Sequence, residues 1–128
     1  MLDDLAAAGT WVDDWESMLH QRATTARELS TRLTAMTATT RDRSGLISVT
    51  VSSSGSIMDL TLDERCRQQS AAETARQILA TVRTAQAQVL EQIRAVTGQA
   101  YGEGSATAES ITESYRQRLH PDGPDAAR

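Results

Sequence analysis

Proline does not occur in this sequence before Pro121, so nothing in the preceding chain forces a long element to break. Along that stretch the spacing of the apolar residues changes twice, from steps of three and four to alternation and back again. Steps of three and four are typical of a helix, and alternation is typical of a β-strand with one covered face. The sequence therefore predicts a long helix, a small β-sheet and a second long helix.

The first apolar stripe indicates a helix of about 26 residues. Thr10 and Asp13 have the spacing of a capping box, which predicts that the helix begins there. Arg22 interrupts the stripe: its long side chain can carry the guanidinium out to solvent, or it marks where the helix leaves the core, and a buried ion pair is the less favoured alternative. We expect residues 1–9 to add a short helical turn or to stay loose. The apolar members of the stripe are Val12, Trp15, Leu19, Ala26, Leu29, Leu33 and Met36.

The alternating segment begins at Leu46 and ends before Asp63. Its two halves flank residues 53–56, a Ser/Gly run with turn chemistry, so they predict a β-hairpin. The Thr-rich segment 37–42 can supply a third, shorter strand. A hairpin alone is marginal in water, so we expect this sheet to lie against the helices and against a second copy. The residues expected to face inward are Ile47, Val49, Val51, Met58, Leu60 and Leu62.

A second capping-box pair, Ser70 and Glu73, predicts the start of the other long helix. Its apolar stripe continues to Val96, and Gly98 can terminate the helix. Residues 99–128 then turn small, polar and finally rich in helix breakers. We predict that they form a flexible extension with a possible short helix, whose apolar side would hold Ile111, Tyr115 and Leu119.

Composition sets the character of the core. The chain has 128 residues, enough for one domain, and it is 39% hydrophobic but only 3% aromatic. We predict an α+β fold with the order α-β-β-β-α over residues 1–98. Both predicted helices are much longer than the strands of the sheet, so the sheet cannot cover their apolar stripes. We therefore expect a homodimer to cover them. The residues expected to pack in the core or between subunits are Trp15, Leu19, Leu29, Leu33, Val49, Val51, Leu60, Val82, Val89 and Ile93.

Residues 45–63 read GLISVTVSSSGSIMDLTLD, and an AQAQ segment lies in the second predicted helix. Together these features resemble the YbaB/EbfC family of nucleoid-associated proteins, in the divergent form common in GC-rich bacteria. The resemblance implies a tweezer-like homodimer with sheets at its centre and helices as arms, which binds duplex DNA with little sequence preference. It also implies a rival role, because some relatives in GC-rich genomes belong to specialised secretion systems. The acidic first helix, with Asp13, Asp14 and Glu16, departs from the Lys-rich helix of better-known members.

Arginines provide the candidate DNA contacts, although the net charge is −4 and the chain has no Lys. Arg76, Arg83 and Arg94 lie within roughly 20° of one direction on a helix, in a row about 27 Å long that could follow phosphates. The alternative is an ordinary solvated face with local Glu–Arg pairs at Glu73 and Glu91. Further arginines surround the sheet, where they either contact phosphate or a partner, or discourage edge-to-edge pairing. These are Arg41, Arg43, Arg65 and Arg67.

Trp11 and Trp15 lie near the start of the first helix. They could stack on bases, but anchoring the helix or packing against a partner subunit is the favoured interpretation. His20, His120 and Cys66 lack the short spacings of a zinc site, so we expect no metal or other cofactor. A lone cysteine also allows no internal disulfide, which favours the cytoplasm.

Nothing in the sequence resembles a catalytic constellation, and no apolar run approaches the length of a membrane span. We therefore predict a non-catalytic, nucleoid-associated protein with weak sequence specificity, whose partners are a second copy of itself and double-stranded DNA. We expect no membrane association. The alternative is a protein-binding adaptor or secretion-associated accessory protein of the same fold, with little DNA affinity. Its acidic first helix and its tail would meet a basic or apolar partner.

Overall fold

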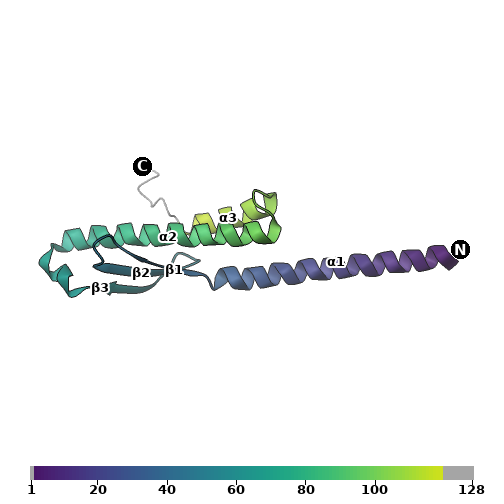
Figure 1. Cartoon of the computed structure of the whole chain (residues 1–128), viewed down its shortest axis with the longest axis horizontal. Helices are drawn as coiled ribbons and strands as arrows, with labels where there is room; N and C mark the ends of the chain where they lie inside the picture. The colour runs from purple at the N-terminus through teal and green to yellow at the C-terminus, as the bar shows by residue number, and fades with distance from the viewer. Residues whose placement is uncertain (1, 120–128) are drawn as a thin grey trace. The chain divides into compact units, whose positions relative to one another are not determined.

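The computed structural model describes residues 2–119, with side chains from residue 6 onward. They divide into two compact units, one up to Arg32 and the other from Leu33 onward. The order of elements confirms the predicted α+β class and adds a third helix (Figure 1). The elements are α1 (Leu2–Thr34), β1 (Thr37–Arg41), β2 (Ile47–Ser52), β3 (Ile57–Leu62), the short 3₁₀ helix η1 (Glu64–Gln68), α2 (Ala71–Tyr101) and α3 (Ala106–Leu119).

Helix α1 begins well before the predicted start at Thr10. The hydroxyl of Thr10 donates to the carbonyl of Ala6, one turn earlier in the same helix, at 3.0 Å, so it caps nothing. Residues 5–8 read Leu-Ala-Ala-Ala, and these strong helix formers extend the helix toward the N-terminus. Arg22 is exposed, as expected for a long side chain that reaches water from an apolar stripe.

Three antiparallel strands form one sheet in the order β1-β2-β3. The predicted hairpin and the short third strand are both confirmed. Strand β2 lies in the middle and buries Ile47, Val49 and Val51 completely, since alternate residues of a strand face the same side. Helix α2 packs on β1 and β2, and the side chains of Thr40 and Gln88 join them through a 2.7 Å hydrogen bond.

Strand β3 leaves exposed the residues that we expected to face inward, although Leu60 and Leu62 pair with Val49 and Ile47 of β2 and so lie on the same face of the sheet as these buried residues. All six of its residues are exposed, and four of them are apolar: Ile57, Met58, Leu60 and Leu62. The strand is an edge of the sheet, and α2 lies over the other two strands instead. Alternation along a strand shows that it has two different faces, but it does not show whether one chain covers either of them.

The predicted cap of α2 is confirmed, because the Ser70 hydroxyl accepts the backbone N–H of Glu73 at 3.1 Å. The helix does not end near Thr97, however, and continues to Tyr101. Gly98 lies buried within the helix, where the missing side chain leaves room for Glu103. Gly102 ends the helix instead, with a φ of 95° that favours glycine.

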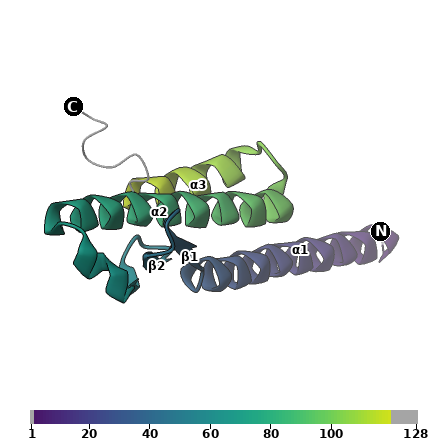
Figure 2. The same cartoon turned by 60° about the vertical axis from the view of Figure 1, so that its left-hand side comes forward.

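Helix α3 folds back along the C-terminal half of α2 (Figure 2). It buries Ala108, Thr112 and Leu119, and the last of these is completely inaccessible. The segment expected to be a flexible extension therefore includes a docked helix. Its predicted flexibility and the division at residue 98 stay predictions, and the acidic tail from residue 120 lies outside the described residues.

The residues predicted to pack fall into two groups. Trp15, Leu19 and Leu60 are exposed in the single chain, and Val82 is half-buried, so residues 2–119 do not bury these four. The others belong to the interior of the chain. They are Leu29, Leu33, Val49, Val51, Val89 and Ile93. Within residues 2–119 no helix is both long and apolar enough to cross a membrane.

Candidate nucleic-acid interface

The arginines of α2 lie on the part of the helix that the sheet leaves uncovered. Arg76 and Arg94 are exposed, and each pairs with the acid three residues earlier, at 2.5 Å for Glu73 and 3.9 Å for Glu91. The Arg76 guanidinium holds the pKa of Glu73 below its usual range through a hydrogen bond and its charge. These local pairs match the solvated-face alternative, and because both partners are exposed they add little to stability.

Arg83 differs from its neighbours in the predicted row, because its side chain is half-buried. Helix α3 packs on the C-terminal half of α2, beyond Arg83, with Thr97 and Thr112 in contact across the two helices. The helical spacing alone indicated that all three arginines face solvent. The structure shows that the middle one, Arg83, is less exposed than the other two. Sequence spacing places residues around a single helix, but it does not show where a second helix will lie.

A cavity of about 300 Å³ opens between α2 and α3. Arg94 lines it together with three acids, Glu91, Glu103 and Glu109. This end of α2 is therefore acidic on balance, which weakens the case for a phosphate contact at Arg94. The other end of the row, around Arg76, carries one acid within reach.

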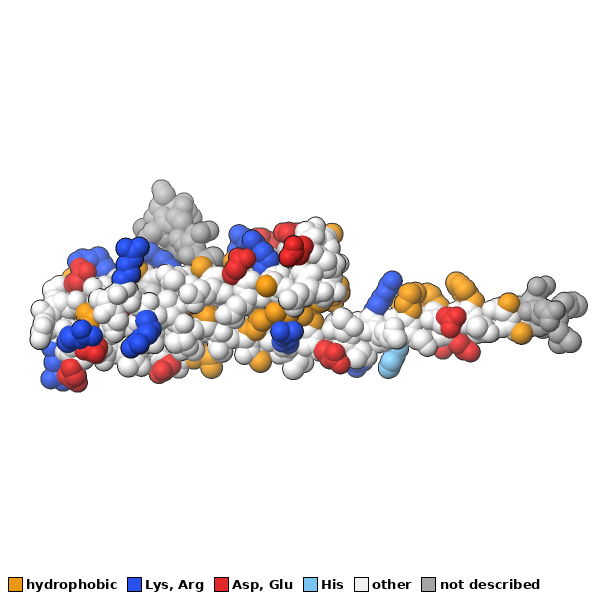
Figure 3. All heavy atoms as spheres, viewed as in Figure 1, with side chains coloured by type: hydrophobic (Ala, Val, Ile, Leu, Met, Phe, Trp, Pro, Cys, Tyr) orange, Lys and Arg blue, Asp and Glu red, His pale blue; other side chains and the backbone are white. Residues whose placement is uncertain are grey.

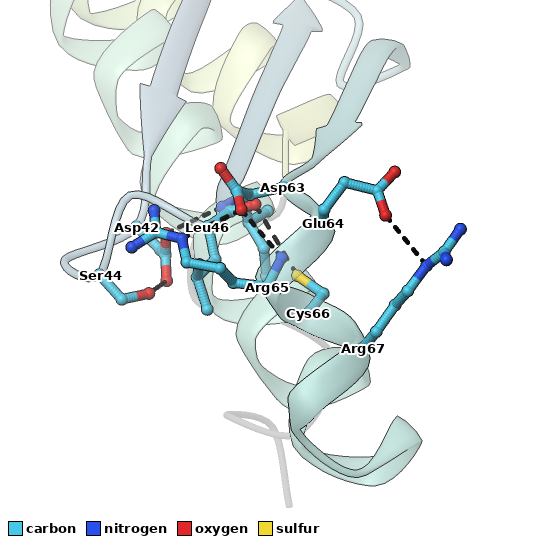
Figure 4. Close-up of polar contacts among 9 residues, drawn as sticks. Asp42, Ser44, Leu46, Asp63, Glu64, Arg65, Cys66 and Arg67 are labelled. Carbon is cyan, nitrogen blue, oxygen red and sulfur yellow. Dashed lines mark hydrogen bonds and ion pairs between the residues drawn. The ribbon is translucent and has the colours of Figure 1, made fainter.

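The second group of arginines lies at one end of the sheet, where Figure 4 shows two of its members, Arg65 and Arg67. Arg65 reaches back to Asp63 at 3.0 Å, and Arg67 pairs with Glu64 at 3.0 Å on the surface of η1. Hydrogen bonds from the Arg65 backbone and side chain lower the pKa of Asp63, and the charge of Arg41 adds to the effect. All four arginines of the group are exposed.

Arg41 and Arg43 are the arginines of this group that make no ion pair within residues 2–119. Arg41 ends β1, and Arg43 lies in the turn that leads to β2. Asp42 fixes that turn by accepting the Ile47 backbone N–H at 3.0 Å and the Ser44 hydroxyl (Figure 4). The two guanidiniums are thus held on a well-defined turn and are available to an anion.

The carboxylate of Asp42 shows why this turn is stable at neutral pH. Burial alone would raise its pKa, but the hydrogen bonds from Ser44, Ile47 and neighbouring backbone groups outweigh burial and lower it. The ionised form is therefore the one that holds the turn between Arg41 and Arg43.

Helix α3 supplies two basic residues that the sequence analysis did not include. Arg116 pairs with Glu113 at 3.2 Å, and Arg118 lies 5.0 Å from the centre of the Tyr115 ring. Both stand on a segment predicted to be an extension, so only the docked position of α3 could have revealed them. Their Glu and Tyr partners lie on the same helix, as helical spacing would allow.

No cluster of ligand-type side chains that could hold a metal ion occurs among residues 2–119. Cys66 is half-buried, with its Sγ 3.9 Å from the Leu46 carbonyl oxygen. His20 is exposed on α1, and His120 lies outside the described residues. The arrangement that the structure does offer is a set of exposed guanidiniums on α2 and at one end of the sheet.

A sequence model of the YbaB/EbfC DNA-binding family matches residues 13–104. The match extends over more than half of the sequence, and the chain belongs to this family, as the resemblance of residues 45–63 predicted. No curated protein matches the chain. Among solved structures it is similar to the uncharacterized protein HP0035 from Helicobacter pylori, with 16% identity and a TM-score of 0.45 over 59% of this chain and 88% of that chain.

Proposed function

We propose that this protein is a non-catalytic, nucleoid-associated homodimer that binds duplex DNA with weak sequence preference. Membership of a DNA-binding family over residues 13–104 is the observation that carries the proposal. The exposed arginines on α2 and at the sheet end supply the chemistry, because a guanidinium offers phosphate oxygens a planar pair of donors. Weak preference follows because these side chains suit the backbone of DNA rather than the edges of its bases.

The local ion pairs do not prevent phosphate binding. Arg76, Arg65 and Arg67 pair with carboxylates that are themselves exposed, and such pairs are worth at most about 1 kcal/mol. A phosphate can therefore replace the carboxylate at small cost. Arg41 and Arg43 need no such exchange, so we expect the sheet end to contribute more to affinity than Arg94 does.

A gel-shift titration at two salt concentrations tests DNA binding. We expect binding at low salt that weakens steeply as salt is added, since each neutralised phosphate releases counterions. Arg41→Glu with Arg43→Glu should weaken binding at least about tenfold, because two phosphate contacts become repulsive. Arg27→Glu with Arg32→Glu makes the same change in net charge on exposed positions of α1 and is the matched control.

Two results would contradict the proposal. The first is the absence of a shifted band even at low salt. The second is an equal loss of affinity in the control and in the sheet-end variant, because that would indicate dependence on net charge alone. The first result would favour the alternative, an adaptor or secretion-associated accessory protein. In that case a pull-down with this protein should recover one stoichiometric protein partner that binds the acidic helix α1.

The homodimer is proposed on a separate observation, the apolar surface that one chain leaves uncovered. Strand β3 exposes four apolar side chains on a sheet edge, which is a surface that proteins usually protect. A second copy could cover it. Light scattering that gives a monomer at micromolar concentration would contradict this part of the proposal.

A further inference from the structure

Helix α2 carries one continuous, mostly apolar stripe, which we call the seam, and only its C-terminal half is buried by the rest of the chain. The seam follows steps of three and four, which keep residues on one side of a helix. At its C-terminal end Leu90, Ile93 and Thr97 are buried, and α3 packs on this half of the helix. At its N-terminal end Leu79 is 56% exposed. The members of the seam are Ala72, Ala75, Leu79, Val82, Gln86, Leu90, Ile93 and Thr97.

The end of α3 marks the point where the cover stops. The Gln86 amide donates to the Gly55 carbonyl at 3.4 Å, and a Cβ placed on Gly55 would lie 2.8 Å from the Arg118 carbonyl oxygen near the end of α3. Helix α3 therefore reaches the level of Gln86 and goes no further as a described helix. Among the described residues no helix covers Leu79 on the seam before Gln86, and we call residues 72–83 of α2 the open seat.

Helix α1 offers a face of matching type. Trp11 is 67% exposed, and its ring stacks on that of Trp15 with the centroids 6.5 Å apart and the planes 7° from parallel. Val12, Met18 and Leu19 lie on the same side and are also exposed. Figure 3 shows orange side chains gathered on this helix beside red carboxylates. So large an apolar stripe indicates a partner.

The charges beside the two surfaces are opposite. From residue 6 to residue 21 the charged side chains of α1 are all acidic, and Asp14 and Glu16 border the apolar face about 100° to either side of its centre. The open seat is bordered along one side by Arg76 and Arg83, and the acid there, Glu73, is the exposed local partner of Arg76. Carboxylates on one helix and guanidiniums on the other, beside an apolar seam, are the arrangement that pairs helices.

Pairing α1 with another α1 is less favourable. In that case Asp14 and Glu16 would face the same acids of the second copy, and like charges beside a seam oppose pairing. The basic half of α1 cannot serve instead, because Leu29 and Leu33, which continue the stripe there, are already buried in the chain.

We propose that the acidic, tryptophan-bearing face of α1 docks on the open seat of α2 in a second copy of the chain. In a two-fold dimer each copy gives one α1 and receives the other, so two such seats form. The inference rests on the homodimer of the proposed function and is independent of DNA binding. It also places Arg76 and Arg83 at a subunit boundary, so it leaves the sheet-end arginines as the main candidates for phosphate.

Tryptophan provides the test, because Trp11 and Trp15 are the two tryptophans of the chain. Acrylamide quenches exposed tryptophan, and since it is uncharged its access does not depend on the protein's charge. In the full-length wild type at dimer-forming concentration we expect shielded tryptophans. Asp14→Arg with Glu16→Arg should raise quenching severalfold, and so should Arg76→Glu with Arg83→Glu. Asp13→Arg with Glu28→Arg makes the α1 charge change away from the face and should leave quenching unchanged.

Mixing the two charge-reversed variants is the decisive step. In a mixed dimer each reversed α1 meets a reversed seat, and each native α1 meets a native seat. Shielding should therefore return on mixing, although each variant alone is exposed. A contact between α1 and α2 of the same chain would give no such rescue.

Leu79→Ser keeps the test valid if a charge-reversed variant does not fold. Leu79 is exposed in the single chain, so its loss should spare the fold and still expose the tryptophans of the partner. Ala80→Ser, on another side of the helix, is its control. Fully accessible tryptophans in the wild type, or unchanged shielding in Leu79→Ser, would overturn the inference. Tryptophans that become shielded only when a different protein is added would also overturn it, whereas a failed gel shift with intact rescue would remove only the DNA-binding proposal.

Discussion

Gly55 lies where three segments of the protein meet. Its φ of 89° is one that side chains rarely allow, and a Cβ placed on it would lie 2.8 Å from the Arg118 carbonyl oxygen. A side chain here would therefore strain the β2–β3 turn and push α3 away. Both the positive φ and the lack of space for a Cβ therefore require glycine at this position.

We predict that Gly55→Ala destabilises the protein more than Gly45→Ala does. Gly45 has a similar φ of 75° but has open space where the Cβ would be, so it should cost only about 1 to 2 kcal/mol of backbone strain. The clash at Gly55 should add about 1 kcal/mol or more, as overpacking does. Urea unfolding of the two variants measures the difference, and equal losses would show that α3 does not press on this turn.

Asp42 makes stability depend on pH in a defined direction. Its pKa is lowered in the folded state, so the unfolded chain binds protons more readily, and the carboxylate stabilises the fold above its unfolded pKa. That contribution is lost as pH falls through the folded pKa, which means below about pH 4. Asp63 and Glu73, with lowered pKa values, add to the same trend.

We predict that Asp42→Asn lowers the free energy of unfolding at neutral pH and that the loss shrinks below about pH 4. Chemical unfolding of wild type and variant across this pH range gives the measurement. Ser44→Ala, which removes one of the hydrogen bonds to the carboxylate, should act in the same direction but less strongly. A loss that stays constant down to the lowest pH would contradict the assignment.

The two capping motifs, at Ser70 and Thr10, show when a local sequence pattern predicts the start of a helix. The Ser70 cap was predictable, because Ser at the N-cap and an acid three residues later define the local geometry without help from the rest of the chain. Thr10 has nearly the same local pattern, but helix-forming residues precede it and the helix runs straight through. A cap motif therefore predicts a helix start only when the preceding residues do not themselves favour a helix.

At the level of elements, α3 is the addition that the sequence analysis underestimated. Its sequence is mostly polar, and its apolar positions look too few to hold a helix in place. The structure shows that small residues allow close packing against α2 and that Leu119 secures the far end. Neither effect is visible without knowing that Gly102 turns the chain back.

We predict that Leu119→Ala releases α3. Removing a completely buried leucine typically costs about 2 to 5 kcal/mol, and this one lies at the free end of a helix held by few other apolar side chains. Hydrogen exchange should show α3 amides losing protection while those of β2 keep it. Gln117→Ala, two residues earlier and exposed, should change stability by less than about 0.5 kcal/mol.

Strand β3 was predictable as an element, but its exposure was not. The three strands were predictable from alternation and turn residues, and their number and order agree with that prediction. Whether a single chain would cover β3 at all was not predictable, since α2 spans two strands and leaves the third outside. Which strands a helix covers depends on the crossing of helix and sheet, and a period of two carries no information about it.

At the level of the whole molecule, the uncovered surfaces of α1 and β3 lead to a thermodynamic prediction. If two copies cover them, unfolding is coupled to dissociation, and the melting temperature rises with protein concentration. Circular dichroism melts over a wide concentration range provide the measurement. A melting temperature that does not change would show that the single chain is the stable unit.

The candidate interface could be predicted only in part. The helical spacing placed Arg76, Arg83 and Arg94 on one side of α2, and it also identified Glu73 and Glu91 as local partners. It could not show that Arg83 would be half-buried or that α3 would create an acidic cavity at Arg94. Long-range packing of a segment outside the family match decides which arginines stay available.

The ion pairs of Arg65, Arg67, Arg76, Arg94 and Arg116 share one property, because each joins residues two or three positions apart in the sequence. Pairs between such near neighbours tie no element to another, and exposed pairs weaken readily in salt without loss of tertiary structure. Concentrated electrolyte should therefore wash carried-over nucleic acid from freshly purified protein and leave it natively folded. The same treatment should make preparations comparable before any titration begins.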